Sequence, residues 1–150
     1  MSAQLTKKQL VLLRFIALGG EREIDPVRLM KGLFVVAQES PSTWLKKSER
    51  YDFTPYNWGP CSFDIYNDLR RLQVSGLISA RSEYGRTWDT YAITVAGNAQ
   101  AEQAASHLGQ ELDGYIQIVR NWVSSMSFTD LLKEIYKRYP DSAVNSVFKY

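Results

Sequence analysis

The side chains best suited to recognise another molecule lie between residues 62 and 75, a segment with helical periodicity. Ile65, Leu69 and Leu72 recur at the spacing of one buried helix face, which leaves polar side chains on the other face. Arginine, asparagine and glutamine can form paired hydrogen bonds with the edges of bases in the major groove of DNA. The candidates for such contacts are Asn67, Arg70, Arg71 and Gln73.

The same face also carries an argument against DNA. Asp64 and Asp68 are expected to lie outward beside the arginines, where they would repel phosphate groups. Residues 60–94 hold four basic and four acidic side chains, so they have no net charge to drive counterion release. A solvated helix face is the simpler interpretation of these charges, and both interpretations stay open.

A β-hairpin is expected directly after this helix. Residues 78–82 and 87–93 have the composition of strands, and Gly85 in the connection can adopt a positive φ. A helix that leads into a hairpin forms the second half of a winged helix-turn-helix. The wing would carry three residues able to contact the DNA backbone, namely Arg81, Tyr84 and Arg86.

A second group of candidates precedes this helix. Lys46, Lys47 and Arg50 are interleaved with aromatic residues, a combination that suits a nucleic-acid backbone or a single strand. A loop kept in solution by its lysines is the competing interpretation. The aromatic residues that could instead bind a protein partner are Trp44, Tyr56 and Trp58.

These candidates belong to an insert of more than twenty residues, whereas a plain helix-turn-helix joins its helices through about three or four. Its many aromatic residues predict an ordered lobe with a short strand at 51–53. Gly59 and Pro60 are expected to interrupt regular structure. The residues that could line a small-molecule pocket, although core packing is their commoner role, are Tyr56, Trp58, Tyr66 and Trp88.

No motif predicts catalysis. Cys61 precedes a helix start, where the pKa of a thiol can be lowered, but the one histidine, His107, belongs to another helix and no motif supports it. One cysteine and one histidine do not make a zinc site, and the sequence has no phosphate loop or nucleophile motif. We therefore expect no enzymatic activity, cofactor or metal, with Cys61 as a small buried residue.

Helical periodicity and capping residues predict the other elements. Helices are expected to begin after Thr6, Asp25, Thr94 and Ser127. The helix at 95–108 has only a narrow apolar stripe, so it is expected to pack against a second copy of the chain in a homodimer. The predicted organisation is an elaborated winged-helix domain over 1–94 and a C-terminal helical extension over 95–150.

The overall composition predicts a folded cytoplasmic protein that does not contact a membrane. No apolar run reaches the roughly 18 residues of a membrane-spanning helix, and no signal-peptide pattern is present. The single cysteine fits a reducing compartment. The net charge of +2 is concentrated in residues 1–50, which hold nine basic and five acidic side chains.

The run YDFTPYNWGPCSFDIYNDLRRLQVSGLI resembles a pattern of small, mostly uncharacterised bacterial and archaeal YwgA-like proteins, and LLKEIYKRYPDSAVNS resembles their C-terminal tyrosine–proline segment. The helix–aromatic–Gly-Pro–helix core is more loosely similar to the Panacea (SocA-like) antitoxin domain. TYAITVAGNAQAE is similar to the end of the wing in PadR- and MarR-type regulators. These resemblances imply a winged-helix core and a prokaryotic source near defence or toxin–antitoxin genes, and they imply no catalytic residues.

We therefore expect a mainly α protein with a small β-hairpin, built as a winged helix-turn-helix core with an aromatic insert and a C-terminal helical extension. The expected function is that of a non-enzymatic transcription regulator that binds double-stranded DNA through residues 62–75 and the hairpin, with 44–51 as an additional contact. The alternative is a protein-interaction module, antitoxin-like or part of a defence complex, that docks through the aromatic lobe at 44–60.

Overall fold

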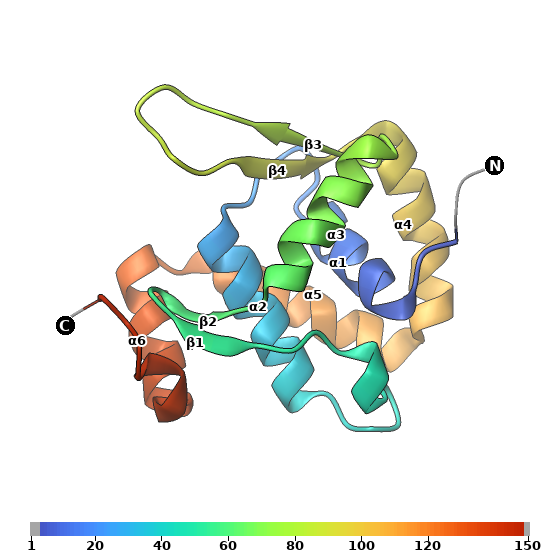
Figure 1. Ribbon diagram of the computed structural model, residues 1–150. Helices are drawn as coiled ribbons and strands as arrows, with labels where there is room; N and C mark the ends of the chain where they lie inside the picture. The colour runs from blue at the N-terminus through green and yellow to red at the C-terminus, as the bar shows by residue number, and fades with distance from the viewer. Residues whose placement is uncertain (1–3, 149–150) are drawn as a thin grey trace.

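The computed structural model describes residues 4–148 and shows a mainly helical molecule with two small antiparallel hairpins (Figure 1). The helices are α1 (Lys7–Ala17), α2 (Pro26–Glu39), α3 (Phe63–Val74), α4 (Val95–Leu108), α5 (Gln110–Ser125) and α6 (Phe128–Arg138), with short 3-10 turns η1 (Lys47–Glu49) and η2 (Pro140–Ala143). The strands pair as β1 (Thr54–Tyr56) with β2 (Gly59–Cys61), and β3 (Ile78–Arg81) with β4 (Thr90–Ile93). The mainly α prediction is confirmed, with two hairpins in place of the expected one.

The predicted capping residues begin their helices. Thr6 forms a capping box with Gln9 at α1, and the other side chains that accept a backbone N–H of the first turn are Asp25, Thr94 and Ser127. Ser62 occupies the N-cap position of α3, but its hydroxyl has no hydrogen-bond partner among the described residues. The capping pattern therefore predicted where the helices begin, but not every bond at those positions.

The β1–β2 hairpin was not predicted from the sequence. The expected strand at 51–53 begins instead at Thr54, and Gly59 and Pro60 lie within β2. Pro60 lies opposite Pro55. A proline is tolerated here because a two-stranded hairpin has only edge strands, where a missing N–H need not leave a neighbour unpaired.

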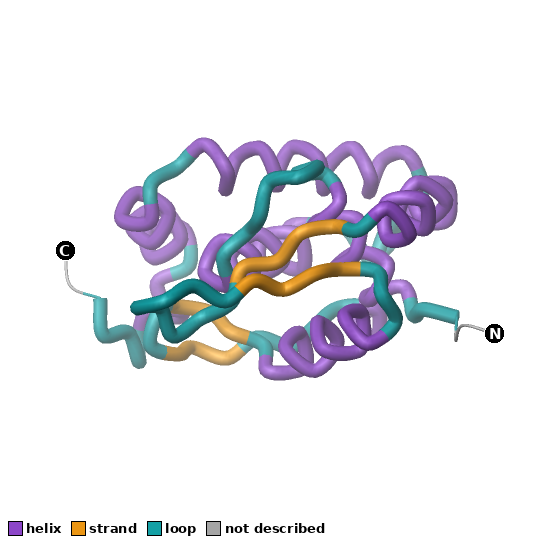
Figure 2. The backbone as a smooth tube through the Cα atoms, turned by 90° about the horizontal axis from the view of Figure 1, so that it is seen from above, coloured by secondary structure: helices purple, strands orange, loops and turns teal. Residues whose placement is uncertain are grey.

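The two hairpins flank α3, which crosses the front of the molecule between them (Figure 1). Figure 2, seen from above, shows β3 and β4 lying side by side with their long connection extending beyond them. The loop between α1 and α2 joins this hairpin, because the backbone of Ile24 exchanges two hydrogen bonds with Tyr91 of β4, at 2.8 and 3.0 Å. Glu23 in the same loop forms an ion pair with Arg81 of β3 and accepts a hydrogen bond from Thr90.

The helices after residue 94 share one core with the helices before it. α4 packs along α1, and α5 packs against α1 and α2. The narrow apolar stripe of α4, which includes Ala101, Ala104 and Leu108, is buried. Packing within the chain thus accounts for the stripe that suggested a dimer interface, and homodimer formation stays a prediction.

A buried ion pair fixes α1 to α5. Arg14 donates from Nε to Oδ1 of Asp113 at 2.7 Å and from Nη2 to Oδ2 at 3.2 Å, and both side chains are buried. Gln117 donates a further hydrogen bond to the same carboxylate. This paired geometry offsets part of the cost of removing two charges from water.

Gly97 allows the start of α4 to dock against the turn after α3. A Cβ at this position would lie 1.8 Å from the carbonyl oxygen of Leu77 and 2.8 Å from Cδ1 of Ile93. We expect Gly97→Ala to lower the free energy of unfolding by about 1–3 kcal/mol, because the nearer atom is backbone and α4 must move away.

Urea denaturation measures this change, and Gly114→Ala in α5 is the matched control. A Cβ at Gly114 would meet no atom within 4 Å, so this substitution should be neutral or stabilising, since alanine favours a helix by up to about 1 kcal/mol over glycine. Equal stability of the two variants would show that α4 does not need this close approach.

The return of the chain after η2 braces the β1–β2 hairpin. The backbone N–H of Val147 donates to the carbonyl of Asn57 at 2.9 Å, and the side chain of Asn145 donates to the carbonyl of Pro55 at 3.2 Å. Ser146 donates to Asn57 as well.

In the described part of the chain, no helix has the length and apolar character needed to cross a membrane.

Candidate nucleic-acid interface

α3 presents an exposed polar face between the two hairpins. The residues predicted to contact bases, Asn67, Arg70, Arg71 and Gln73, are all exposed on it. Within the described residues, neither the side chain of Arg70 nor that of Arg71 forms a hydrogen bond or an ion pair. Both also line a groove between α3 and residues 4–9. Two cationic side chains on one helix are therefore available to an external partner.

Asp68 lies inside the molecule, so its predicted outward position was wrong. It is 7% exposed, and its carboxylate accepts hydrogen bonds from the hydroxyl of Tyr51 at 2.7 Å and from Nε2 of Gln9 at 2.9 Å. Burial, together with the hydrogen bond to Asp68, raises the pKa of Tyr51 well above its ordinary value. One of the two acidic groups expected to repel phosphate is thus removed from this face, and Asp64 remains exposed.

The hairpin arginines are engaged within the protein. Arg81 lies 2.6 Å from Glu23, and Arg86 lies 3.1 Å from Glu83 while also donating to two backbone carbonyls of the hairpin. Tyr84, in the connection between β3 and β4, is exposed. Of the three predicted wing contacts, Tyr84 alone can meet a partner without exchanging an ion pair for the new contact.

The basic residues of the predicted patch at 44–51 have different environments in the structure. Lys46 and Lys47 are exposed, but Arg50 donates from Nε to the carbonyl of Leu45 at 3.1 Å and from its terminal nitrogens to the carbonyls of Leu45 and Ala37. Arg50 therefore joins the insert to the end of α2. Spacing along the sequence does not reveal such a contact, because the acceptors are backbone carbonyls.

The predicted partner-binding aromatics also differ from one another. Trp44 is half-buried, donates from its indole to Glu111 at 2.7 Å and contacts the ring of Tyr115. Tyr56 and Trp58 of the β1–β2 hairpin are 46% and 43% exposed. The structure thus ties Trp44 to α5 and leaves the other two for an external contact.

Tyr56 and Trp58 line two adjoining hollows, here together called the aromatic cleft. Their walls come from α2, α3, the start of α6 and both hairpins, and their exposed aromatic side chains are Tyr56, Trp58, Phe63, Tyr66 and Trp88. The possible pocket residues of the sequence analysis, for which core packing was the commoner expectation, thus line one cleft. Phe63 was not predicted, because its position at the start of a helix carries no distinguishing signal.

Lys31 lies at this cleft and was also not predicted. It is 2% exposed, lines one of its two hollows, and donates from Nζ to the carbonyl of Pro60 at 3.0 Å. Burial lowers the pKa of Lys31 to about 8. The available signal was its place on the apolar face of α2, four residues after Val27 and three before Phe34.

Cys61 neighbours Lys31 and is a buried free thiol, as predicted. Burial raises its pKa, and the positive charge of Lys31 acts in the opposite direction. A thiol with a raised pKa is a poor nucleophile. His107 is exposed, and the described residues contain no group of three or more side chains placed to hold a metal ion.

The comparisons with protein families and with curated proteins found no relative of this chain. No protein-family model matches the chain, and no curated protein is significantly similar to it. The resemblance to YwgA-like proteins and to the Panacea domain therefore stays a prediction.

Proposed function

We propose that this protein is a non-enzymatic regulator that binds double-stranded DNA through α3 and the β3–β4 hairpin. The observation that carries the proposal is the pair Arg70 and Arg71, which is exposed and unpaired within the described residues. The helix that bears this pair runs directly into the hairpin, and its Asp68 is directed inward.

The order of elements supports a winged helix-turn-helix core. In that fold the helix before the wing enters the major groove of DNA. Here α1, the Ile24 bridge, α2, α3 and the β3–β4 hairpin follow one another along the chain. The departure is the insert between α2 and α3, and its exposed Lys46 and Lys47 are proposed as additional backbone contacts.

One basic residue of the N-terminal third, Lys8, also lies near α3. Lys8 lies over the ring of Tyr51, 5.5 Å from its centroid, and the hydroxyl of Tyr51 reaches Asp68 of α3. The first turn of α1 is thus a neighbour of the proposed interface. Lys8 can thus add one positive charge to residues 60–94, which have no net charge by themselves.

Fluorescence anisotropy with a mixed-sequence duplex across a salt series tests the proposal. We expect binding that weakens steeply as salt rises from about 50 to 200 mM. Arg70→Gln/Arg71→Gln should weaken binding at least tenfold and lower the slope of log K against log salt by roughly 0.9 for each phosphate that the variant no longer neutralises. Arg81→Gln/Arg86→Gln should have a smaller effect, because these arginines are already paired within the protein.

Lys137→Gln/Arg138→Gln on α6 removes the same charge from another helix and serves as the control. Equal weakening by the two double variants would show that net charge alone governs binding. Absence of binding at low salt would exclude the regulator proposal.

The second candidate function is protein interaction, and the aromatic cleft is the observation that favours it. Monomeric proteins rarely expose several large aromatic side chains around one hollow unless a partner or ligand covers them. The cleft lies beside α3, and its rings include Tyr56 and Trp58 of the predicted docking lobe. If DNA binding is absent, docking through this cleft becomes the favoured function.

A further inference from the structure

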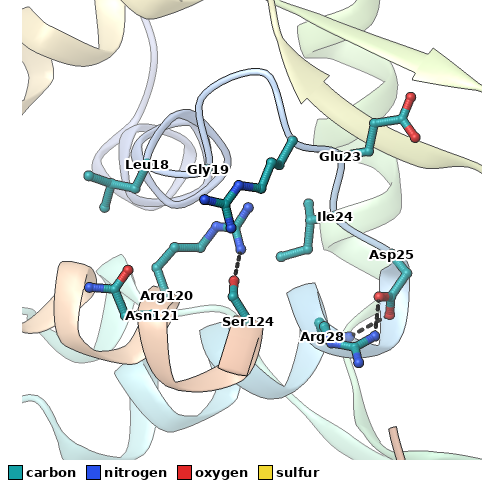
Figure 3. Close-up of a pocket in the computed structure, with 10 residues that line it drawn as sticks. Leu18, Gly19, Glu23, Ile24, Asp25, Arg28, Arg120, Asn121 and Ser124 are labelled. Carbon is teal, nitrogen blue, oxygen red and sulfur yellow. Dashed lines mark hydrogen bonds and ion pairs between the residues drawn. The ribbon is translucent and has the colours of Figure 1, made fainter. Parts of the chain in front are cut away.

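A separate pocket lies between the loop after α1 and the second half of α5 (Figure 3). Its volume is about 300 Å³. The loop contributes Leu18, Gly19, Arg22, Glu23 and Ile24, and α5 contributes Arg120, Asn121 and Ser124. None of these side chains was predicted from the sequence to bind a ligand.

Arg120 brings a buried positive charge into this pocket. It is 4% exposed, donates from Nε to the carbonyl of Phe15 at 2.9 Å, and donates from Nη1 to the hydroxyl of Ser124. Both acceptors are neutral, and within the described residues Nη2 has no hydrogen-bond partner. A buried guanidinium without a carboxylate partner is costly to the folded state.

Arg22 adds a second positive charge to the same pocket. It forms no hydrogen bond or ion pair through its side chain with a described residue. Burial lowers the pKa of Arg120, the charge of Arg22 lowers it further, and Asp25 has a smaller opposite effect. The two guanidinium groups are therefore close enough to repel each other.

The carboxylates at the rim do not neutralise these two cations. Asp25 is paired with Arg28 at 2.7 Å, and Glu23 is paired with Arg81 on the hairpin. Figure 3 shows the carboxylate of Glu23 directed away from Arg120. Among the described residues, Arg22 and Arg120 are therefore the two arginines of the pocket without a carboxylate partner.

Gly19 shapes the space around Arg120. A Cβ at Gly19 would lie 2.0 Å from Nη2 of Arg120, so the missing side chain leaves room for this nitrogen. The guanidinium is also held against the ring of Phe15, with 5.6 Å between its central carbon and the ring centroid. Its position is thus fixed by the fold before any ligand arrives.

We propose that this pocket binds the phosphoryl group of a small phosphorylated molecule between Arg22 and Arg120, with Ser124 and Asn121 as further polar contacts. The planar donors of arginine match the oxygens of phosphate. A phosphate dianion neutralises both cations, whereas a carboxylate neutralises one. The volume is at the lower end for small-molecule pockets, which favours a short phosphomonoester over a nucleotide.

Inorganic phosphate is the first probe, titrated at constant ionic strength against chloride. We expect saturable binding by calorimetry and a shift of the Nε–H resonance of Arg120 in the NMR spectrum. Arg22→Gln removes the exposed cation without disturbing the core and should weaken binding at least tenfold, whereas Arg138→Gln, which removes an equal charge from α6, should leave it unchanged.

Two further ligands test whether the pocket binds small phosphorylated molecules or phosphopeptides. Glycerol 3-phosphate should bind at least as tightly as phosphate, and a phosphoserine peptide should bind more weakly because the pocket is small. Tighter binding of the peptide would overturn the small-molecule assignment. No saturable phosphate binding, or equal weakening by Arg22→Gln and Arg138→Gln, would overturn the site itself, and neither result depends on DNA binding at α3.

Discussion

Asp113→Ala lowers the free energy of unfolding by about 3–5 kcal/mol in our expectation, the largest loss we predict for a single substitution. The substitution would leave Arg14 without its carboxylate partner. The guanidinium of Arg14 is buried and both of its side-chain hydrogen bonds end on Asp113, so removal of the carboxylate leaves a charge inside the core. Gln117 loses an acceptor at the same time.

Urea denaturation followed by circular dichroism measures this loss, and Glu102→Ala is the matched control. Glu102 lies 3.7 Å from Arg14, but its side chain is mostly exposed, so its removal should cost less than about 1 kcal/mol. The double variant Arg14→Met/Asp113→Leu should recover most of the stability, since buried ion pairs can be replaced by apolar residues. A loss below about 1 kcal/mol for Asp113→Ala would show that Arg14 finds water when its partner is removed.

Lys31→Met should raise the free energy of unfolding at neutral pH, whereas Asp113→Ala lowers it. Lys31 is a buried cation whose pKa falls from 10.5 to about 8, a difference worth roughly 3 kcal/mol against the folded state while both states are protonated. Methionine removes this cost but also loses the hydrogen bond to Pro60, worth about 1 kcal/mol. We therefore expect the variant to be about 2 kcal/mol more stable at pH 7.

The advantage should disappear as pH rises. Between about pH 8 and 10.5 the folded wild type releases the proton of Lys31 while the unfolded chain retains it, so the wild type gains stability with pH. Tyrosines whose pKa values are raised, such as Tyr51 and Tyr66, destabilise both proteins alike above about pH 10. Denaturation at pH 7 and 9.5, with exposed Lys137→Met as control, separates these effects, and a pH-independent difference would contradict the buried-cation account.

Local signals predicted the helices well. Thr6, Asp25, Thr94 and Ser127 mark the observed helix starts, because an N-cap depends on a few adjacent residues. The small residues of α4 were harder to interpret. Their apolar stripe looked too narrow for packing within the chain, yet Ala101 and Ala104 are buried and α4 packs along α1.

The candidate site was predicted in outline only. The exposed face of α3 is at the predicted position, but periodicity did not show that Asp68 lies inward, since its partners Tyr51 and Gln9 are distant in sequence. The predicted outward role of Arg50 also failed, because its side chain donates to backbone carbonyls of the protein, which the sequence does not reveal. The phosphate pocket was not predicted, because Arg22 and Arg120 are separated by most of the chain.

Contacts between residues far apart in the chain hold the C-terminal helices to the rest of the molecule. Arg14 reaches Asp113 across 99 positions, Arg120 reaches the carbonyl of Phe15 across 105, and Asn145 reaches that of Pro55 across 90. During synthesis, residues 1–94 therefore emerge without the groups that pair their buried arginine and brace their insert. The proposed DNA-binding half is complete only when the last helices have formed, so its long-range contacts must close after most of the chain has been synthesised.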